Sequence, residues 1–250
     1  MRRLSDPETI APILNREWPW TGFALGDLEP EWMAHSEWVQ AAGTLVLLFD
    51  GLSPRLLCPY GDNSGLNEIL SSVHDERVWA NIRPDDEAIF RKWYDAGRCV
   101  RMVRMYLDRP VPATGVAQRL TPDDEPEIRE LLKQGEWVLF LPGALAAGHY
   151  YGVRIGGRLA AIAGTHLASV RYDTAAVGSV FTHPGYRGRG LATVCTSHVL
   201  ASVAHQGITR VVLNVEEEKA GARRVYERLG FKTHCVYLDG ACERRATSAP

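Results

Sequence analysis

The amino-acid sequence predicts an α/β protein in which a mixed β-sheet is flanked by helices. Strand-like runs rich in β-branched residues alternate with segments whose apolar residues recur at helical spacing. A hairpin signal over residues 150–167 precedes an alternating series of strands and helices. The composition, 46% hydrophobic and 23% charged, is typical of a globular chain with a sizeable core.

The N-terminal part of the chain alternates helical and extended patterns. Its four expected helices cover residues 6–16, 29–40, 64–73 and 84–94, the second of them carrying Trp32 and Trp38. Its four expected strands cover residues 43–50, 55–60, 78–82 and 100–107. The first two strands are separated by Gly51-Leu52-Ser53-Pro54 and are expected to form a hairpin.

Proline and glycine cluster over residues 110–115, PVPATG, between these elements and the next helix. Such a stretch is typical of a domain boundary. We therefore expect an N-terminal α/β domain over residues 1–112 and a second domain over residues 113–250.

The second domain is expected to begin with a helix capped by Thr121, because proline and two acids follow that residue. A hairpin then covers residues 150–155 and 159–167, joined by two glycines. The remaining elements are expected to be a strand over 175–181, a helix from 191 to Gly207, a strand over 208–215, a helix ending at Gly230 and a strand over 231–238.

Charge and cysteine usage narrow the function class. The chain has 28 Lys and Arg against 30 Asp and Glu, with no concentrated basic run, so we expect neither a nucleic-acid surface nor membrane binding. We find no signal-peptide pattern and no membrane-length apolar segment, and we expect a cytoplasmic protein. The five cysteines are scattered without metal-like spacing, which predicts reduced thiols and no metal site.

Residues 177–192, VGSVFTHPGYRGRGLA, join a strand to a helix through a turn rich in arginine and glycine. The first amides of a helix lack intrahelical partners, and the helix dipole is positive at that end. Gly188 and Gly190 let the backbone approach a ligand closely, while Arg187 and Arg189 add charge. This stretch predicts a binding site for a phosphate or pyrophosphate group.

Two familiar phosphate-binding patterns fit this stretch poorly. The ATPase loop requires a lysine followed by a hydroxyl residue, and neither stands at the necessary position. The dinucleotide fingerprint requires a third glycine where the chain has Thr193, and too little chain follows for a doubly wound sheet.

The segment RGRGLA at residues 187–192 resembles the Arg/Gln-x-x-Gly-x-Gly/Ala signature of the GNAT acyltransferase superfamily. The hydrophobic strand and Thr182-His183-Pro184 before it, and the later strand, helix and Leu229-Gly230-Phe231, are similar to the family in order and spacing. A finer likeness is to the glycine N-acyltransferase-like branch. The resemblance implies a GNAT fold in the second domain, with the first domain a degenerate copy or a divergent N-terminal half.

The resemblance also implies acetyl-CoA as the usual acyl donor, with no metal. Tyr226 stands where the family places the tyrosine that protonates the leaving thiolate; packing in the core is the other role open to it. The residues that the resemblance assigns to coenzyme A are Val180, Phe181, Thr182, Arg187, Gly188, Arg189, Gly190, Leu191 and Ala192. Lys219 replaces an asparagine that is common in the family, and it either meets a CoA phosphate or is solvated.

The general base is less clearly marked, because residues 174–177 lack the glutamate that many family members carry there. His166 is our candidate, since an imidazole titrates near neutral pH. Asp173, His183 and the glutamates at 216–218 remain alternatives, as does a chain of water molecules.

We therefore expect a CoA-dependent N-acetyltransferase that acts by direct attack of a primary amine of a small molecule or amino acid. The alternative is a catalytically idle acyl-CoA sensor. Homo-oligomers remain open. The tryptophans Trp18, Trp20, Trp32 and Trp38 either wall an acceptor pocket or pack in the core.

Overall fold

The computed structural model describes residues 1–97, 99–135, 138–146 and 149–246. Its contacts divide the chain into two compact units. Unit 1 contains Met1–Arg104, Val215–Glu218 and His234–Pro250, and unit 2 contains Met105–Asn214 and Lys219–Thr233. The predicted domains, 1–112 and 113–250, follow the chain continuously, whereas these units follow contacts and give the end of the chain to unit 1.

Unit 1 is built on a sheet with the strand order β1-β2-β3-β4-β5-β13. The strands are β1 (Arg2–Leu4), β2 (Ser36–Ala41), β3 (Thr44–Phe49), β4 (Leu56–Gly61), β5 (Arg77–Ile82), β6 (Tyr94–Asp95), β7 (Val100–Leu107) and β13 (Phe231–Arg244). Residues 105–107 of β7 and 231–233 of β13 count with unit 2. The helices are α1 (Pro7–Asn15), α2 (Gly22–Gly26), α3 (Pro30–Met33), α4 (Leu66–Ser72) and α5 (Pro84–Trp93). The chain thus follows the expected alternation of helices and strands.

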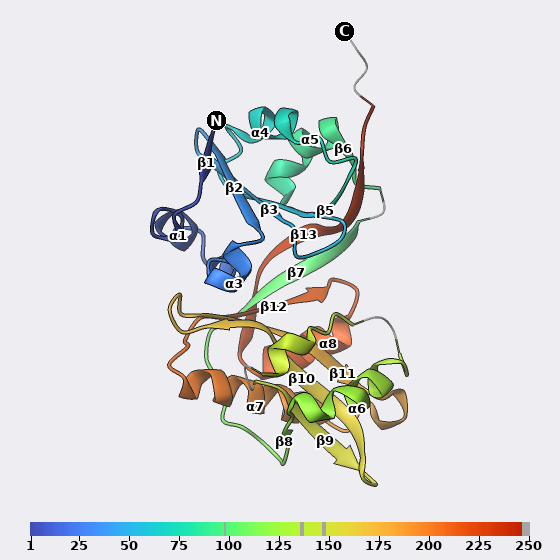
Figure 1. Ribbon diagram of the computed structural model, residues 1–250. Coiled ribbons are helices and arrows are strands. Elements are labelled where there is room, and N and C mark those ends of the chain that lie inside the picture. The colour runs from blue at the N-terminus through green and yellow to red at the C-terminus, as the bar shows by residue number, and fades with distance from the viewer. Residues whose placement is uncertain (98, 136–137, 147–148, 247–250) are drawn as a thin grey trace. The chain divides into compact units, whose positions relative to one another are not determined.

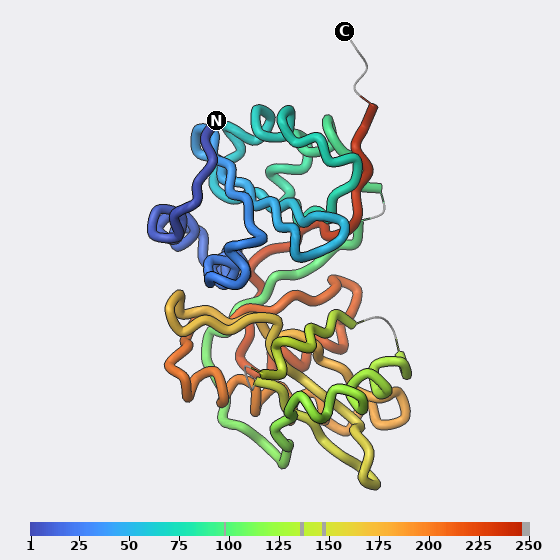
Figure 2. Tube along the Cα trace, in the orientation of Figure 1, coloured from blue at the N-terminus to red at the C-terminus, as the bar shows by residue number. Residues whose placement is uncertain are grey.

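The pairing within unit 1 is mixed. Strands β2, β3 and β4 form an antiparallel meander, and β4 then pairs in parallel with β5 across the helix α4. Strand β13 comes from the far end of the sequence and pairs antiparallel with β5, as Figures 1 and 2 show in dark red beside blue-green. Apolar residues of α4, α5 and these strands make one core, in which Leu66, Ile69 and Phe90 are fully buried.

One predicted element is wrong. Residues 29–40 were expected to be a helix, but the helix α3 ends at Met33 and residues 36–41 form the strand β2. All six positions of β2 pair with β3, and part of β2 also pairs with β1. These long-range ladders override the local helical preference, and they bury Trp38 completely.

Unit 2 has the strand order β12-β11-β10-β9-β8. The strands are β8 (Gln118–Arg119), β9 (Tyr151–Ile155), β10 (Arg158–Ser169), β11 (Thr174–Thr182) and β12 (Val211–Glu216), whose last two residues count with unit 1. The helices are α6 (Glu125–Leu132), α7 (Leu191–His205) and α8 (Ala220–Arg228), and short 3-10 turns span Pro122–Asp124, Pro142–Leu145 and Pro184–Tyr186. The predicted order of helix, hairpin, strand, helix, strand, helix and strand is confirmed.

Helices cover the sheet of unit 2. The start of α6 follows a capping box in which Thr121 and Asp124 hydrogen-bond reciprocally, as the sequence indicated. Ile128 and Leu131 of α6 pack on Ile162 and Phe181 of the sheet, and α7 packs on β9, β10 and β11. The predicted class, a mixed sheet flanked by helices, is therefore confirmed.

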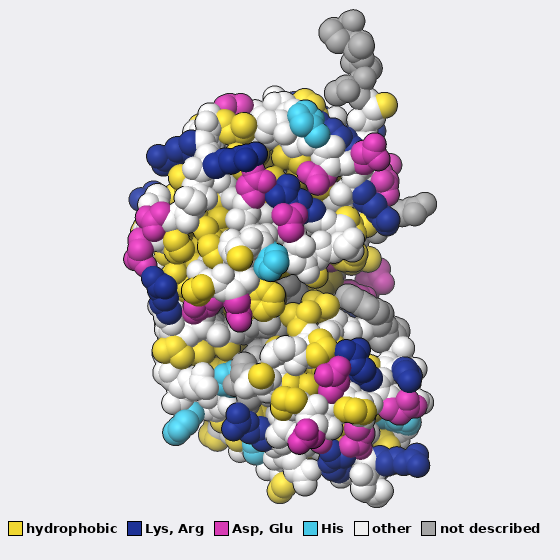
Figure 3. All heavy atoms as spheres, viewed as in Figure 1, with side chains coloured by type: hydrophobic (Ala, Val, Ile, Leu, Met, Phe, Trp, Pro, Cys, Tyr) yellow, Lys and Arg dark blue, Asp and Glu magenta, His cyan; other side chains and the backbone are white. Residues whose placement is uncertain are grey.

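Two further features of the fold concern the charges on its surface and the length and apolar character of its helices. Basic and acidic side chains are interspersed on the face shown in Figure 3. In the part of the chain that the structure describes, no helix combines the length and apolar character needed to cross a membrane.

Candidate functional site

The candidate site in unit 2 lies where two parallel strands stop pairing. Strand β11 pairs with β12 only over Ala175–Val177 and Val211–Leu213, although β11 itself runs on to Thr182. A cavity of about 670 Å³ is lined by the end of β11, the arginine–glycine loop, the first turn of α7 and one face of α8. Ligands often bind beyond the carboxyl ends of parallel strands, where the chain leaves the sheet.

The loop at residues 187–190 is shaped by glycine. Gly188 and Gly190 both have φ of 77°, a conformation that residues with a Cβ rarely adopt, and Gly190 is the N-cap of α7. The amide of Val194 donates to the Gly190 carbonyl, so the amides at 191–193 precede the first intrahelical bond. Leu191, Ala192 and Thr193 all line the cavity, which therefore has the unpaired amide end of a 15-residue helix in its wall.

Positively charged side chains surround the same cavity. Arg187 lines it and donates from Nε to the Thr182 carbonyl at 3.3 Å, which fixes the guanidinium beside the strand end. Lys219 lines it from the turn before α8, and Arg228 lines it from the last turn of α8. Arg189 is not among the lining residues, and its guanidinium lies 5.2 Å from the centre of the Tyr186 ring. These charges and the helix amides make the cavity suited to a polyanion.

A β-bulge interrupts β11 at the other side of the cavity. Phe181 pairs with Ile162 and Gly178 pairs with Gly164, so Ser179 and Val180 stand opposite the single residue Ala163. Ser179 has φ of 50°. A bulge leaves one backbone group outside the ladder, and Val180 lines the cavity at this point. The strand edge can therefore offer backbone hydrogen bonds to a bound chain.

Hydroxyl groups hold this bulge. Ser179 donates from Oγ to the Leu139 carbonyl at 2.7 Å, and its Oγ lies 3.0 Å from the hydroxyl of Tyr150. Tyr150 is fully buried. The strained backbone of Ser179 is thus supported by the two segments packed against it.

Tyr226 points from α8 into the lining of the cavity. Its side chain is 7% exposed, and its ring packs edge to face with Phe231 at 6.1 Å. Burial raises the pKa of Tyr226 to about 12, so the phenol stays protonated at neutral pH. A protonated phenol is therefore present in the wall of the cavity.

His166 lies elsewhere in unit 2. It is not among the residues that line the cavity, and its Nε2 lies 3.3 Å from the Leu139 carbonyl. Burial lowers the pKa of His166 to about 4, so the ring is neutral at pH 7. A Cβ placed at Gly178 would meet the His166 ring at 2.1 Å, which shows how closely the ring lies against β11.

Two alternative bases have structural partners. Asp173 precedes β11, at the opposite end from Thr182, and accepts hydrogen bonds from the backbone and side chain of Thr209 at 2.6 and 2.7 Å. Nδ1 of His183 accepts from the Gly185 amide at 3.0 Å. Asp173 therefore links two distant segments of the chain, and His183 holds its own turn.

The cavity brings together most of the residues that the sequence singled out. Tyr226 and eight of the nine residues assigned to coenzyme A line it, the ninth being Arg189. Sequence reasoning did not assign to the site seven other described residues that line the cavity: Val138, Tyr186, Thr193, Gly221, Ala222, Val225 and Arg228. Arg228 could have been found, because it follows Val225 at helical spacing on the face of α8 that the cavity uses. Val138 had no local signal.

A smaller cavity of about 190 Å³ lies in unit 1. Its charged side chains already pair with one another: Arg55 contacts Glu37 at 2.7 Å and Asp75 at 3.7 Å, and Arg3 contacts Glu37 at 2.8 Å. These matched charges give that cavity no evident ligand chemistry.

Comparison with protein families bears on unit 2. Residues 117–231 match the model of the acetyltransferase (GNAT) family. This part of the chain is therefore similar to a GNAT domain. The matched range contains the loop, the bulged strand, Tyr226 and the cavity that they form.

Individual relatives agree with this assignment over shorter stretches. The chain is similar to a mycothiol acetyltransferase of Beutenbergia cavernae, with 38% identity over 30% of this chain and 27% of that protein. A mycothiol acetyltransferase of Corynebacterium aurimucosum matches at 38% identity over 26% of this chain and 23% of the relative. The chain thus spans about a quarter of the length of these curated relatives.

Solved structures match over nearly the whole chain. A GNAT-family acetyltransferase from Colwellia psychrerythraea has a TM-score of 0.65 at 12% identity and covers 98% of this chain and 100% of its own. A GCN5-related N-acetyltransferase from Kribbella flavida has a TM-score of 0.64 at 13% identity over 94% of this chain and 95% of its own. At such identities the likeness concerns the fold.

Proposed function

We propose that this protein is a GNAT enzyme that transfers an acetyl group from acetyl-CoA to a primary amine of a small molecule. The observation that carries the proposal is the cavity of unit 2. It combines a helix amide end with basic side chains, a bulged strand edge and a protonated tyrosine.

The residues present fit coenzyme A. The amides at the start of α7, with Arg187, are suited to the pyrophosphate, and we propose that Lys219 and Arg228 add charge there. The edge of β11 at Val180, Phe181 and Thr182 is suited to the amide-bearing pantetheine arm, because it offers backbone groups in an extended conformation. Arg189 does not line the cavity, and in our proposal it acts only by adding to the positive electrostatic potential of the loop.

The protein must assist three steps of the reaction. The amine nitrogen attacks the thioester carbon, the carbon–sulfur bond breaks, and the thiolate takes up a proton. In our proposal Tyr226 supplies that proton, and backbone N–H groups of the bulged β11 stabilise the carbonyl oxygen as it gains charge. The amine's own proton must leave before or during the attack.

His166 remains our proposed base for that proton. Its ring is neutral at physiological pH and can accept a proton, but a group with a pKa of about 4 is a weak base. Transfer through water to His166 is compatible with its position behind β11, because the ring lies against Gly178 of the same strand. A chain of water molecules ending in solvent is the alternative.

Two features support a small acceptor. The curated relatives named above are acetyltransferases named for mycothiol. The visible surface shows mixed charges rather than an acidic groove that would favour basic peptides. The finer placement in the glycine N-acyltransferase-like branch and a cytoplasmic location stay predictions.

The proposal is tested by following the free thiol released from acetyl-CoA with a panel of small amines, amino acids and peptides. We expect turnover with at least one small amine and formation of its N-acetyl product, checked by mass spectrometry. CoA binding without turnover on any acceptor would contradict the enzymatic assignment and support the alternative, an acyl-CoA sensor.

We also propose that unit 1 is a degenerate copy of the same fold. Its order, antiparallel β2-β3-β4, helix α4, parallel β5 and helix α5, repeats the order β9-β10-β11, α7, β12 and α8 of unit 2. The last residue of β4 and the segment that leads to α4, together residues 61–65, take the place of the arginine–glycine loop.

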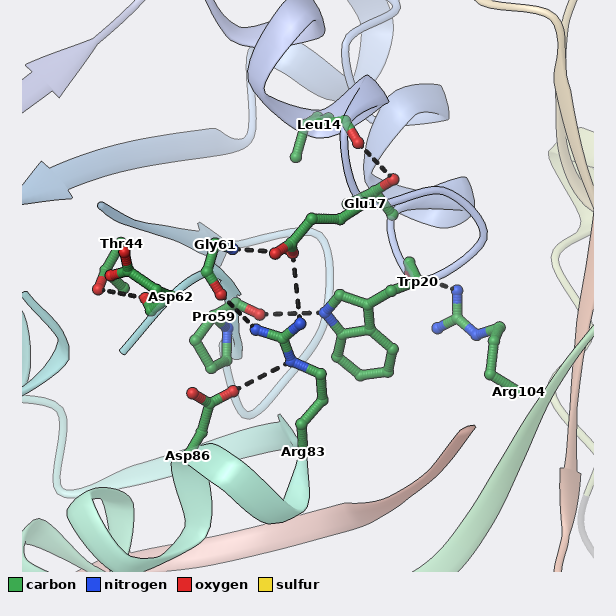
Figure 4. Close-up of polar contacts among 11 residues, drawn as sticks. Leu14, Glu17, Trp20, Thr44, Pro59, Gly61, Asp62, Arg83, Asp86 and Arg104 are labelled. Atoms are coloured by element: carbon green, nitrogen blue, oxygen red, sulfur yellow. Dashed lines mark hydrogen bonds and ion pairs between the residues drawn. The ribbon is translucent and has the colours of Figure 1, made fainter. Parts of the chain in front are cut away.

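In this second loop the backbone amides are occupied by the chain's own side chains. Glu17 accepts from the Gly61 amide at 2.8 Å, and Thr44 accepts from the Gly65 amide at 2.9 Å. Arg83 lies between Glu17 and Asp86 and donates to the Gly61 carbonyl at 2.6 Å, as Figure 4 shows. A carboxylate thus lies where a bound anion would sit, so we propose that unit 1 does not bind coenzyme A.

A further inference from the structure

Cys99 and Cys242 of unit 1 lie side by side, although more than half the length of the chain separates them in the sequence. Sγ of Cys99 lies 3.2 Å from Sγ of Cys242, and the two residues are 143 positions apart. Both cysteines are free thiols. Cys99 is half-buried, whereas Cys242 is fully buried in the core of unit 1.

The backbone around the pair is held on both sides. Strand β6 pairs with the end of β13 through Asp95 with Glu243, and the Cys99 amide donates to the Ala96 carbonyl at 3.2 Å in the turn that follows β6. On its other side Cys242 pairs in register with Val78 of β5. Strand pairing thus holds Cys242 on both sides, and a bond between the sulfurs requires their distance to shorten from 3.2 Å to about 2.05 Å.

The two thiols differ in their exposure and in the direction of their pKa shifts. The two sulfurs lie within hydrogen-bond distance of each other, and this hydrogen bond, against the opposing effect of burial, lowers the pKa of Cys99. The same hydrogen bond and burial raise the pKa of Cys242. Partial exposure and thiolate character are what make a cysteine react with oxidants. Burial instead raises the pKa of both Cys58 and Cys195 to about 12, which disfavours their thiolates.

We propose that Cys99 and Cys242 form a peroxide-responsive modification site that closes to an intramolecular disulfide. The Cys99 thiol releases its proton, and the thiolate attacks a peroxide oxygen. The O–O bond breaks, and the leaving hydroxide takes up the released proton, so Cys99 sulfenic acid and water result. The Cys242 thiol then attacks the sulfenic sulfur, the S–S bond forms, and a second water leaves. The two thiols lose two electrons in total, and these reduce one hydrogen peroxide to two waters.

The disulfide would tie the turn after β6 to the end of β13. Because it would join residues 143 positions apart, it would restrict the unfolded chain strongly and stabilise the folded protein. It lies in unit 1, whereas the CoA cavity is lined by unit 2 residues. The inference therefore stands independently of the proposed acetyltransferase activity.

The test treats the reduced full-length protein with hydrogen peroxide and counts its thiols. We expect the wild type to lose two of its five thiols and to yield a Cys99–Cys242 peptide on non-reducing mass mapping. The unfolding midpoint should rise by several degrees and return after dithiothreitol. Loss of only Cys99 as sulfinic acid, a disulfide between other cysteines, or five thiols retained would each overturn the proposal.

Variants make the test specific. Cys99→Ser should abolish the disulfide and the thermal shift, and its half-buried position makes it the safer variant to fold than Cys242→Ser. Cys235→Ser is the matched control, because Cys235 is also half-buried in unit 1 and should leave both effects unchanged. A thermal shift that persists in Cys99→Ser would show that another thiol is responsible.

Discussion

At the scale of single residues, Tyr226 is the side chain whose chemistry is most sharply testable. In Tyr226→Phe the ring still packs on Phe231, while the proton donor is lost. We expect kcat to fall by about 10²-fold, the lower end of what general acid catalysis contributes. The dissociation constant for CoA should change much less. Steady-state kinetics together with calorimetric CoA binding measure both quantities.

Tyr151→Phe is the matched control, because it also removes one phenol from unit 2. Its ring packs on His198 rather than in the cavity lining. Its kcat should stay near wild type. A Tyr226→Phe enzyme with unchanged kcat would remove Tyr226 from the mechanism.

His166 carries a prediction about pH and stability. Its pKa falls from 6.5 to about 4 in the folded protein, because burial disfavours the charged ring. The unfolded chain therefore binds more protons between these two values, and the folded state loses stability as pH drops from about 6.5 toward 4. The loss from this one residue is about 3 kcal/mol at full extent.

His166→Gln should lose that part of the pH dependence. Urea unfolding of both proteins at pH 7 and at pH 4.5 measures the slope of stability against pH, and the variant's slope should be shallower. Equal slopes would show that the imidazole does not titrate differently in the folded and unfolded states.

At the scale of elements, the loop before α7 depends on two glycines with left-handed backbone. A Cβ at Gly188 or at Gly190 would meet no atom within 4 Å, so a substitution there acts through the backbone alone. Holding a residue other than glycine at φ of 77° costs about 1–2 kcal/mol. We expect Gly188→Ala and Gly190→Ala each to weaken CoA binding by about tenfold.

Gly143→Ala is the control for this element. Its position is equally open, but it has no positive φ and does not line the cavity. Calorimetry should give it wild-type affinity for CoA. If Gly143→Ala weakened binding as much as the loop variants, the backbone argument would fail.

At the scale of the whole molecule, the two units are expected to differ in ligand binding. The loop of unit 2 leaves its helix amides to a ligand, whereas Glu17 and Thr44 occupy amides of the corresponding loop in unit 1. We therefore expect one CoA per chain. Arg187→Ala should weaken that single binding event, and Glu17→Gln should leave the stoichiometry unchanged.

Isothermal titration of CoA into each protein measures the stoichiometry. Two sites per chain in the wild type would contradict the proposal that unit 1 is a degenerate copy without CoA. This outcome is separate from the question of catalysis, because a sensor and an enzyme both bind CoA.

Much of the fold was predictable because its signals are local. The hairpin over residues 150–167 has apolar runs on both sides of paired glycines, and the helix after Thr121 has an N-cap residue, a proline and acids in its first turn. The loop at 187–190 was equally legible, since glycine, arginine and the start of an apolar helix lie within a few positions. Such patterns depend on neighbours in the chain, which the sequence displays directly.

Other features depend on partners that are distant in sequence. Residues 36–41 became a strand only through pairing with β1 and β3, and the bulge at Ser179 exists only in the register of β11 against β10. Val138 reaches the cavity, and Cys99 meets Cys242, through the same kind of long-range packing.

The sequence by itself determined the α/β class, the order of most elements, and the glycine–arginine loop with Tyr226 after it. Only the tertiary structure decided where β11 and β12 part to open the cavity, which amides of unit 1 are occupied, and which thiols are neighbours. The physical reason is that turn chemistry and periodicity act over a few residues, whereas register, burial and pKa depend on surroundings assembled from the whole chain.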